Sequence, residues 1–383
     1  MTNKFVLGLD AKRAFCNRSG LGNYARNIIW ALNKYYENIF QVLFTPQVSY
    51  DIFNLKDKNL SFKLDTITLV NPLNIPFYKS LWRSYFLGNQ LDKYNVSVYH
   101  GLSNELPYNI KKANVKKIVT IHDVIFMSHP HLYTKIDANT YFKKTTFALQ
   151  NADVVISVSE ETKNQILKYF KVDPEKIVVV YQPCNRVFNL DYLSEKENSD
   201  LLYSTKNKFN LPNNFMLSVG NIEKRKNLIN VVKAIDEYNI DYPYVIVGKH
   251  TKYADELKSF INQRQIKNVC FLHNVDTLDL KGLYQLADFT IYPSVAEGFG
   301  IPIIESLSSK TPPILNDINC FKEAAGDGAL FTNTQEIRSL AKSIKKFIDD
   351  KELRSEITEK GYNHIQKFSH KQIASKLVDI YLS

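Results

Sequence analysis

Short runs of apolar residues alternate along the chain with segments whose apolar positions recur every three or four residues. The runs indicate strands covered on both faces, and the second pattern indicates amphipathic helices such as 22–36 and 337–350. Predicted strands occupy 4–10, 41–45, 97–101, 116–123, 153–159, 176–183, 215–220, 242–248, 269–274, 288–294 and 312–317. This alternation of strands and helices predicts parallel, doubly wound sheets.

A polar segment, residues 189–214, interrupts the alternation near the middle of the chain. The 383 residues are too many for one ordinary core and fit two domains. We therefore expect an α/β protein of two Rossmann-like domains, residues 1–190 and 191–368, separated by a cleft. Ligands should bind at the carboxyl ends of the strands.

Net charge is distributed unevenly between these halves. Residues 1–190 contain 24 Lys and Arg against 14 Asp and Glu, whereas residues 191–383 contain 25 of each. The excess suggests that the first half meets an anionic partner, and nucleic acid, an anionic membrane surface and an acidic substrate all remain open. A role in solubility alone is the alternative.

Composition narrows the class of protein. Hydrophobic residues make up 44% and charged residues 23%, which indicates a globular chain, and no apolar run reaches the roughly 18–20 residues of a membrane span. The first apolar run is followed at once by Asp10 and two bases, so it predicts a strand and not a signal peptide. The cysteines lack C-x-x-C spacing, and we expect buried, reduced thiols in a cytoplasmic protein at Cys16, Cys184, Cys270 and Cys320.

The stretch SVAEGFGIPIIES, residues 294–306, has the composition of an anion site. A strand precedes it, and Pro302 indicates the start of a helix. The loop Glu297-Gly298-Phe299-Gly300 between them has glycines that allow close approach of a ligand, and the helix start provides N–H groups and partial positive charge.

Two carboxylates flank this anion site. Glu305, about one turn into the helix, is suited to accept hydrogen bonds from a ribose diol, and Glu297 to do so from a second polyol. Sugar, phosphate and sugar in series describe a nucleotide sugar. The alternative is a helix N-terminus stabilised by nearby acids, next to an unrelated glycine turn.

The stretch LSVGNIEKRKNL, residues 217–228, predicts a second phosphate contact. Gly220 ends a strand, and Arg225 and Lys226 precede the next helix. The forked guanidinium of Arg225 and the point charge of the Lys226 ammonium suit a pyrophosphate at this position. Gly248 ends the following strand and is another candidate for close approach. A solvated charge run is the alternative. No D-x-D sequence occurs, so we expect these cations to replace a metal ion.

The first half contains weaker candidates. Gly20 and Gly22 lie just ahead of a helix expected to open near Asn23, as candidates to contact the same diphosphate. His122 and Asp123 end a strand, where a His can donate to a substrate hydroxyl or the reacting centre. A structural His–Asp turn is the alternative.

Residues 74–94 are a candidate for a helix that faces a membrane or an acceptor. Aromatic and cationic side chains interleave there, including Phe77, Lys79, Trp82 and Arg83. Four lysines follow at Lys111, Lys112, Lys116 and Lys117. One more helix packed on the sheet is the alternative.

With these motifs together, the chain resembles the large retaining glycosyltransferase family of GT-B fold, which includes bacterial mannosyl- and glucosyltransferases of surface polysaccharides such as O-antigen. EGFGIPIIE matches its E-x7-E signature, GNIEKRKN its phosphate loop, SGLGNY its N-terminal glycine loop and IHD its cleft histidine. The segment 369–383 is similar to the family's terminal helix, which returns to the first domain. Some members have Arg where this chain has Asn221.

The resemblance implies a role for each motif residue. Glu305 would bind ribose, Glu297 the donor sugar, and Arg225 and Lys226 the leaving diphosphate, while His122 would contact the sugar near the reacting carbon. The backbone N–H groups offered to the donor would be those of Phe299, Gly300 and Ile301. The region around Val275 is our candidate for contacts with the base.

We therefore expect a retaining, metal-independent hexosyltransferase that uses a nucleotide sugar, with GDP-mannose as the first candidate. The acceptor would be a glycan or a lipid-linked oligosaccharide at the cytoplasmic face of an anionic membrane. We expect no cofactor and no nucleic-acid partner. A nucleotide-sugar epimerase or phosphorylase, and a non-enzymatic polyanion-binding protein, are the alternatives.

Overall fold

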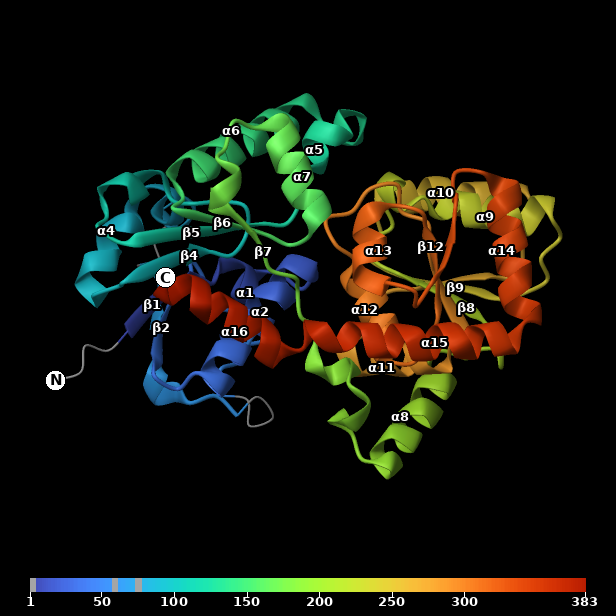
Figure 1. The fold of residues 1–383 in the computed structure, drawn as a ribbon. Coiled ribbons are helices and arrows are strands. Elements are labelled where there is room, and N and C mark those ends of the chain that lie inside the picture. The colour runs from blue at the N-terminus through green and yellow to red at the C-terminus, as the bar shows by residue number, and fades with distance from the viewer. Residues whose placement is uncertain (1–4, 57–60, 73–77) are drawn as a thin grey trace. The chain divides into compact units, whose positions relative to one another are not determined.

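The computed structural model describes residues 5–56, 61–72 and 78–383 (Figure 1). The chain divides into two compact units, Met1–Pro183 with Phe368–Ser383, and Cys184–Lys367. The division follows Pro183, earlier than the predicted position near 190. The reason is that Phe188 packs edge-on against Tyr284, with ring centroids 5.5 Å apart, and so joins the core of the second unit.

The first unit is built on a parallel sheet of seven strands among its described residues, in the order β3-β2-β1-β4-β5-β6-β7. The strands are β1 (Phe5–Asp10), β2 (Ile39–Phe44), β3 (Ile67–Val70), β4 (Val98–Gly101), β5 (Lys116–Ile121), β6 (Val154–Ser157) and β7 (Ile177–Val179). Its α-helices are α1 (Lys12–Cys16), α2 (Gly20–Tyr35), α3 (Tyr78–Leu81), α4 (Gly88–Leu91), α5 (Ile125–Ser128), α6 (Lys135–Asn151), α7 (Glu160–Tyr169) and α16 (His370–Leu382). Because β2 and β3 extend to one side of β1 and β4 to the other, the winding direction reverses between β1 and β4.

The second unit repeats this plan with six parallel strands, in the order β10-β9-β8-β11-β12-β13. The strands are β8 (Met216–Val219), β9 (Tyr244–Val247), β10 (Val269–Leu272), β11 (Phe289–Tyr292), β12 (Pro313–Asn316) and β13 (Leu330–Thr332). Its α-helices are α8 (Glu195–Lys208), α9 (Leu228–Glu237), α10 (Lys252–Gln263), α11 (Thr277–Leu286), α12 (Ile301–Ser308), α13 (Asn319–Ala325), α14 (Ile337–Asp349) and α15 (Lys351–Ile365). The winding direction reverses between β8 and β11. Two parallel Rossmann-like sheets confirm the predicted fold class.

The apolar runs are buried on both faces, as expected for parallel strands. All four residues are buried in each of β4, β9, β11 and β12. The sequence pattern did not predict β3 and β13. Both are edge strands with half-exposed positions, so neither contains a continuous apolar run.

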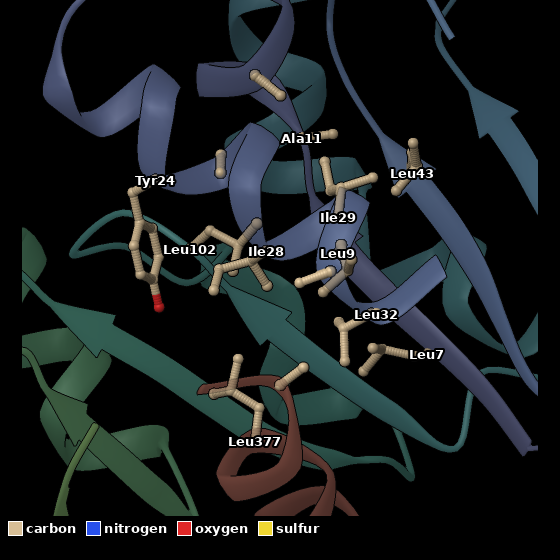
Figure 2. Packing of buried hydrophobic residues seen from close by; sticks show 14 of the residues in the cluster. Leu7, Leu9, Ala11, Tyr24, Ile28, Ile29, Leu32, Leu43, Leu102 and Leu377 are labelled. Atoms are coloured by element: carbon tan, nitrogen blue, oxygen red, sulfur yellow. The ribbon is translucent and has the colours of Figure 1, made fainter. Parts of the chain in front are cut away.

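The terminal helix α16 belongs to the first unit. Figure 2 shows Leu377 of this helix in the same buried cluster as Ile28 and Leu32 of α2 and Leu7 of β1. The hydroxyl of Tyr381 lies 2.8 Å from Nδ1 of the buried His100 at the end of β4. These contacts join the last helix to β1, α2 and β4.

One expectation about the cysteines is corrected. Cys184 and Cys320 are buried, but Cys16 at the end of α1 and Cys270 on edge strand β10 are exposed, so the prediction of four buried thiols is wrong for these two. Within the described part of the chain, no helix combines the length and apolar character that crossing a bilayer requires.

Candidate functional site

The second unit has a pocket at the point where its winding direction reverses. Its empty space, open solvent included, is about 240 Å³, and it is lined by Ser218, Val219, Gly220, Asn221, Lys226, Leu228, Ile246, Ile291, Tyr292, Pro293 and Ser294. The carboxyl ends of β8 and β11 therefore form its walls. This is where parallel α/β sheets commonly bind ligands.

Two loops that approach this pocket are joined by an ion triad. Nη1 of Arg225 lies 2.5 Å from one carboxylate oxygen of Glu297, and Nζ of Lys226 lies 2.7 Å from the other. Arg225 also donates to the carbonyl of Ala296 at 2.8 Å, and its own carbonyl accepts from the N–H of Val295 at 2.9 Å. The cations after β8 and the acid after β11 therefore form one rigid group.

This triad keeps Glu297 ionised. Its side chain is only 14% exposed, and burial alone would raise its pKa, but Arg225 and Lys226 lower the pKa to about 2. The sequence interpretation assigned this carboxylate to sugar hydroxyls and did not anticipate the ion pairs. With both cations held in place, the triad presents a preorganised positive edge next to the pocket.

Backbone geometry explains the glycine after β8. Gly220 has φ of +142°, and its N–H donates to the carbonyl of Val247 at 2.9 Å. The nearest atoms to a Cβ at this position would belong to the side chain of Lys226, at 3.4 Å. Gly220 therefore lets the chain turn between the strand and the cationic loop.

The loop after β11 ends in the predicted helix start. Gly300 has φ of +137°, and Pro302 occupies the first turn of α12, as the sequence pattern predicts. The carbonyl of Pro293 accepts a hydrogen bond from Thr334 at 3.0 Å, and the carbonyl of Ser294 accepts one from Asn316 at 2.9 Å. These bonds fix the loop that leads to the helix N-terminus.

Glu305 lies one turn into α12 and is 5% exposed. The hydroxyl of Tyr284 donates to its Oε2 at 3.0 Å and lies 3.1 Å from the hydroxyl of Tyr292, which lines the pocket. Burial raises the pKa of Glu305 to about 7, although the Tyr284 hydrogen bond and the charge of Lys226 lower it. The carboxyl is therefore connected to the pocket wall and titrates near neutral pH.

The two tyrosines were missed by the sequence analysis. Tyr284 lies on α11 and Tyr292 is the last residue of β11, and nothing in the local pattern distinguishes them from core aromatics. Only the folded chain brings both hydroxyls within hydrogen-bonding distance of the Pro302 carbonyl, at 3.4 and 3.1 Å.

Two predicted donor contacts do not line this pocket. A Cβ on Gly248 would be 1.9 Å from the carbonyl oxygen of Gly220, so packing between neighbouring loops already requires this glycine. Val275 is half-buried in the loop that follows the edge strand β10. Neither residue lines the pocket.

The two glycines of the first unit's glycine loop, Gly20 and Gly22, differ in their surroundings. Helix α2 begins at Gly20, earlier than the predicted start near Asn23. A Cβ on Gly22 would be 1.9 Å from the carbonyl oxygen of Asn17, so packing requires this glycine. A Cβ on Gly20 would have no atom of the described chain within 4 Å. Only Gly20 leaves open space for a ligand.

His122 follows β5 and is 5% exposed. Its Nε2 donates to the carbonyl of Leu102 at 2.8 Å, so Nδ1 is the acceptor for the amide of Gln182 at 3.1 Å. Burial lowers the pKa of the imidazole to about 4. The ring is therefore neutral near pH 7, and donation to a substrate hydroxyl would require the bond to Leu102 to break.

The structure corrects part of the prediction that residues 74–94 face a membrane or an acceptor. Trp82 and Arg83 are 3% and 7% exposed, because Trp82 packs in the core and Arg83 pairs with buried carboxylates. Among the described residues of this segment, Leu81, Tyr85 and Phe86 are large hydrophobic side chains that are exposed. Phe77 lies outside the described residues.

The predicted cations near that segment differ in their surroundings. Lys79 is half-buried. Lys111 and Lys112 are exposed, and the Nζ of Lys111 lies 5.5 Å from the ring centroid of Phe147. Lys116 donates to the carbonyl of Ile380 at 2.6 Å and so secures α16, while Lys117 is half-buried.

No group of three or more His, Cys, Asp or Glu side chains with the spacing of a metal site occurs among the described residues.

Comparison with known proteins agrees with this architecture. Residues 18–186 match the family model of Glycosyltransferase Family 4, and residues 202–364 match that of Glycosyl transferases group 1. A crystal structure of Anabaena HepE in complex with UDP and glucose has a TM-score of 0.74, with 17% identity over 99% of both chains, which shows a shared fold.

Curated relatives match over a large part of the chain. The O-antigen chain mannosyltransferase RfbU of Salmonella typhimurium is 32% identical over 62% of this chain and 66% of its own length. The O-antigen chain mannosyltransferase B of Escherichia coli is 25% identical over 76% of this chain and 75% of its own. Since the two family models together cover most of both units, the chain belongs to the group 1 and family 4 glycosyltransferases of GT-B fold.

Proposed function

We propose that this glycosyltransferase transfers a mannosyl residue from a nucleotide-activated mannose, with GDP-mannose as the first candidate, to a glycan or lipid-linked oligosaccharide. The names of the two relatives above, both O-antigen mannosyltransferases, support the choice of sugar. The observation that carries the proposal is the Arg225–Lys226–Glu297 triad beside the pocket of the second unit.

The triad suits the departure of a nucleoside diphosphate. As the glycosidic bond breaks, negative charge collects on the leaving oxygen and the sugar becomes oxocarbenium-like. Lys226 lines the pocket and Arg225 is held rigidly beside it, so both cations are placed before the reaction, and such fixed charges stabilise a transition state most effectively. Each 1.4 kcal/mol of preferential stabilisation corresponds to about tenfold in rate.

Glu297 has a second part in this scheme. In the structure it pairs with both cations, so a bound diphosphate would compete with it for them. We propose that diphosphate binding loosens these pairs and leaves the carboxylate to accept hydroxyls of the donor sugar. Glu305, reached through Tyr284, would bind the ribose.

We further propose that the reaction retains the α configuration of the donor and requires no divalent metal. Both statements rest on the E-x7-E resemblance, the absence of D-x-D from the sequence and the presence of the cation pair. The basic first half and the exposed Leu81, Tyr85 and Phe86 support an acceptor presented at an anionic membrane surface on the cytoplasmic side.

A panel of GDP- and UDP-sugars tests the proposal. The full chain is incubated with each sugar, with and without a lipid extract, in the presence of EDTA, and diphosphate release and product anomeric configuration are measured. The expected result is acceptor-dependent release of GDP from GDP-mannose with an α-linked product. Isomerised sugar without acceptor, or release only after addition of a divalent ion, would contradict it.

A further inference from the structure

A side-chain amide that the donor proposal does not use lies against the buried imidazole of His122. Nε2 of Gln182 lies 3.1 Å from Nδ1 of His122, and the two residues are 60 positions apart in the chain. Both belong to the first unit, and each is only 5% exposed. The pair therefore forms only when the first unit folds, and it is shielded from water.

The backbone decides which ring nitrogen of His122 carries the proton. The carbonyl oxygen of Leu102 lies 2.8 Å from Nε2, and a carbonyl can only accept, so the proton is on Nε2. Nδ1 is then an acceptor, and Gln182 must turn its NH₂ group towards the ring, not its carbonyl oxygen. The tautomer of the imidazole and the orientation of the amide are thus fixed together.

Further contacts hold the imidazole and its backbone in place. The N–H of His122 donates to Oδ1 of Asn104 at 2.7 Å, and the N–H of Asn104 donates to the carbonyl of Thr120 at 2.8 Å. The ring of Tyr24 on α2 packs edge-on against the imidazole, with ring centroids 4.7 Å apart. The hydroxyl of Tyr24 lies 3.1 Å from Oγ1 of Thr120. Rotation of the imidazole would therefore break several contacts at once.

The chain next to Gln182 is anchored as well. Two residues before it, the N–H of Val180 donates to the carbonyl of Ser157 at 2.9 Å and so continues the pairing of β7 with β6. The ring of Tyr181 packs edge-on against that of Phe368, with centroids 5.2 Å apart. The amide of Gln182 is therefore presented to the imidazole from a fixed backbone.

The surroundings of His122 oppose its protonation. Burial is the main cause that lowers the pKa of the imidazole to about 4, and the positive charge of Arg13 on α1 acts in the same direction. Tyr24 is neutral because burial raises its pKa to about 12, and His100 of β4 is neutral because burial lowers its pKa to about 3. The adjacent Asp123 turns a carboxylate oxygen to the backbone N–H two residues further on, at 3.2 Å.

We propose that Gln182 is a positioning residue, which holds His122 as a neutral imidazole with its proton on Nε2 for contact with the donor sugar. The inference rests on the proposed glycosyl transfer, because the family resemblance puts His122 near the reacting carbon. The sugar becomes oxocarbenium-like as the diphosphate leaves, and an imidazolium beside it would repel the developing positive charge. A protonated Nδ1 would face the NH₂ group of Gln182, donor against donor, so the glutamine disfavours the form that slows the reaction.

Gln182→Glu and Gln182→Met test this role, with Gln150→Glu as the matched control. Glutamate has the shape of glutamine but can only accept, so it should favour the imidazolium and raise the titration midpoint of His122 by about two pH units. Methionine is similar in length but cannot donate, so it should leave Nδ1 without its hydrogen bond. Gln150 is exposed on α6, so Gln150→Glu makes the same change of charge at the surface.

Nitrogen-15 NMR of the histidine-labelled full chain measures the state of the ring directly. The spectrum of His122→Asn identifies the ring signals of this residue among those of the eight histidines. At pH 6 we expect a neutral imidazole in the unaltered chain and in the control, but roughly half imidazolium in Gln182→Glu. In Gln182→Met the Nδ1 signal should move to the position of an unbonded nitrogen. Each variant is decisive alone if the other fails to fold, and ring signals like those of the unaltered chain overturn the proposal.

Steady-state kinetics separate this role from a merely structural one. With GDP-mannose, Gln182→Met should lower kcat about tenfold and leave the affinity for GDP unchanged, because GDP would bind to the second unit. Gln182→Glu should lose more activity at pH 6 than at pH 8, while the control follows the unaltered chain. Equal losses at the two pH values would contradict the assignment. Failure of the unaltered chain to release GDP from GDP-mannose would instead refute the proposed function, and the NMR spectra would still decide what Gln182 does to the ring.

Discussion

Glu305 and Glu297 lie eight positions apart, and replacing each by Gln should change stability in opposite directions. Burial raises the pKa of Glu305 from the ordinary 4.5 to about 7, whereas the charges of Arg225 and Lys226 overcome burial at Glu297 and lower its pKa to about 2. Ionisation of Glu305 therefore destabilises the folded state, whereas ionisation of Glu297 stabilises it.

The sign for Glu305 follows from proton linkage. Between pH 4.5 and 7 the native state keeps the proton that the unfolded chain has released, so stability falls as pH rises through this window. The stabilisation is fully present below pH 4.5 and is lost above the folded pKa near 7. The difference between the unfolded pKa of 4.5 and the folded pKa of about 7 corresponds to about 3 kcal/mol in the free energy of unfolding.

Glu297 behaves in the opposite way. Its lowered pKa contributes stability above pH 4.5 that is lost as pH falls towards 2. At pH 8, Glu297→Gln should therefore cost about 3 kcal/mol, because two cations lose their partner. Glu305→Gln should gain a similar amount at pH 8, since a neutral amide can still accept the hydrogen bond from Tyr284.

Thermal melting followed by circular dichroism at pH 5 and pH 8 measures both effects. A change of about 3 kcal/mol in a unit of this size should shift the midpoint by roughly 6–12 °C. Both tryptophans, Trp30 and Trp82, belong to the first unit, so their fluorescence serves as an internal control that neither variant should alter. A loss of stability in Glu305→Gln at pH 8, or a gain that is equally large at pH 5, would refute the assignment of burial as the dominant effect.

Three further predictions concern residues of the proposed donor site and two glycines predicted to contact the donor. Glu305→Gln should weaken binding of GDP alone by about tenfold, whereas Glu297→Gln should weaken mainly the binding of intact GDP-mannose. Calorimetry with both ligands measures these affinities, and equal losses in the two variants would contradict the separate roles. Lys226→Ala should lower kcat roughly tenfold or more with an unaltered circular dichroism spectrum, and unchanged turnover would remove it from the site. Gly248→Ala should lower the melting midpoint, because its Cβ would lie 1.9 Å from a backbone carbonyl oxygen. Gly20→Ala should leave the midpoint unchanged and reduce activity. Melting curves of the two variants show whether this difference in stability exists.

Much of the fold was determined by the sequence alone, because burial on both faces of a parallel strand requires a continuous apolar run. The runs at 97–101 and 288–294 predict β4 and β11, both of which are buried throughout. Edge strands such as β3 and β13 need no such run, so no local signal indicated them. The helix start at Pro302 was also predictable, because a missing N–H suits that position.

The candidate donor site was predictable in its residue types but not in its pairings. Glycines, two cations and two acids in strand–helix loops indicated an anion site for a nucleotide sugar. Glycines allow close approach of a ligand, cations suit a diphosphate, and carboxylates accept hydrogen bonds from sugar hydroxyls. The ion pairs from Arg225 and Lys226 to Glu297 join residues 72 and 71 positions apart, and Tyr284 reaches Glu305 from another helix. Such contacts depend on how strands β8 and β11 lie side by side.

The segment after residue 78 shows most clearly what only the tertiary structure decides. Its alternating aromatic and cationic residues suit a membrane surface or a packed core equally well, because periodicity records which side chains share a face and not what covers that face. The structure buries Trp82 and pairs Arg83 with Asp10 and Glu105, whose carboxylates come from the ends of β1 and β4. Sequence determines which side chains can form an ion pair, but only the folded sheet brings these three charges within hydrogen-bonding distance.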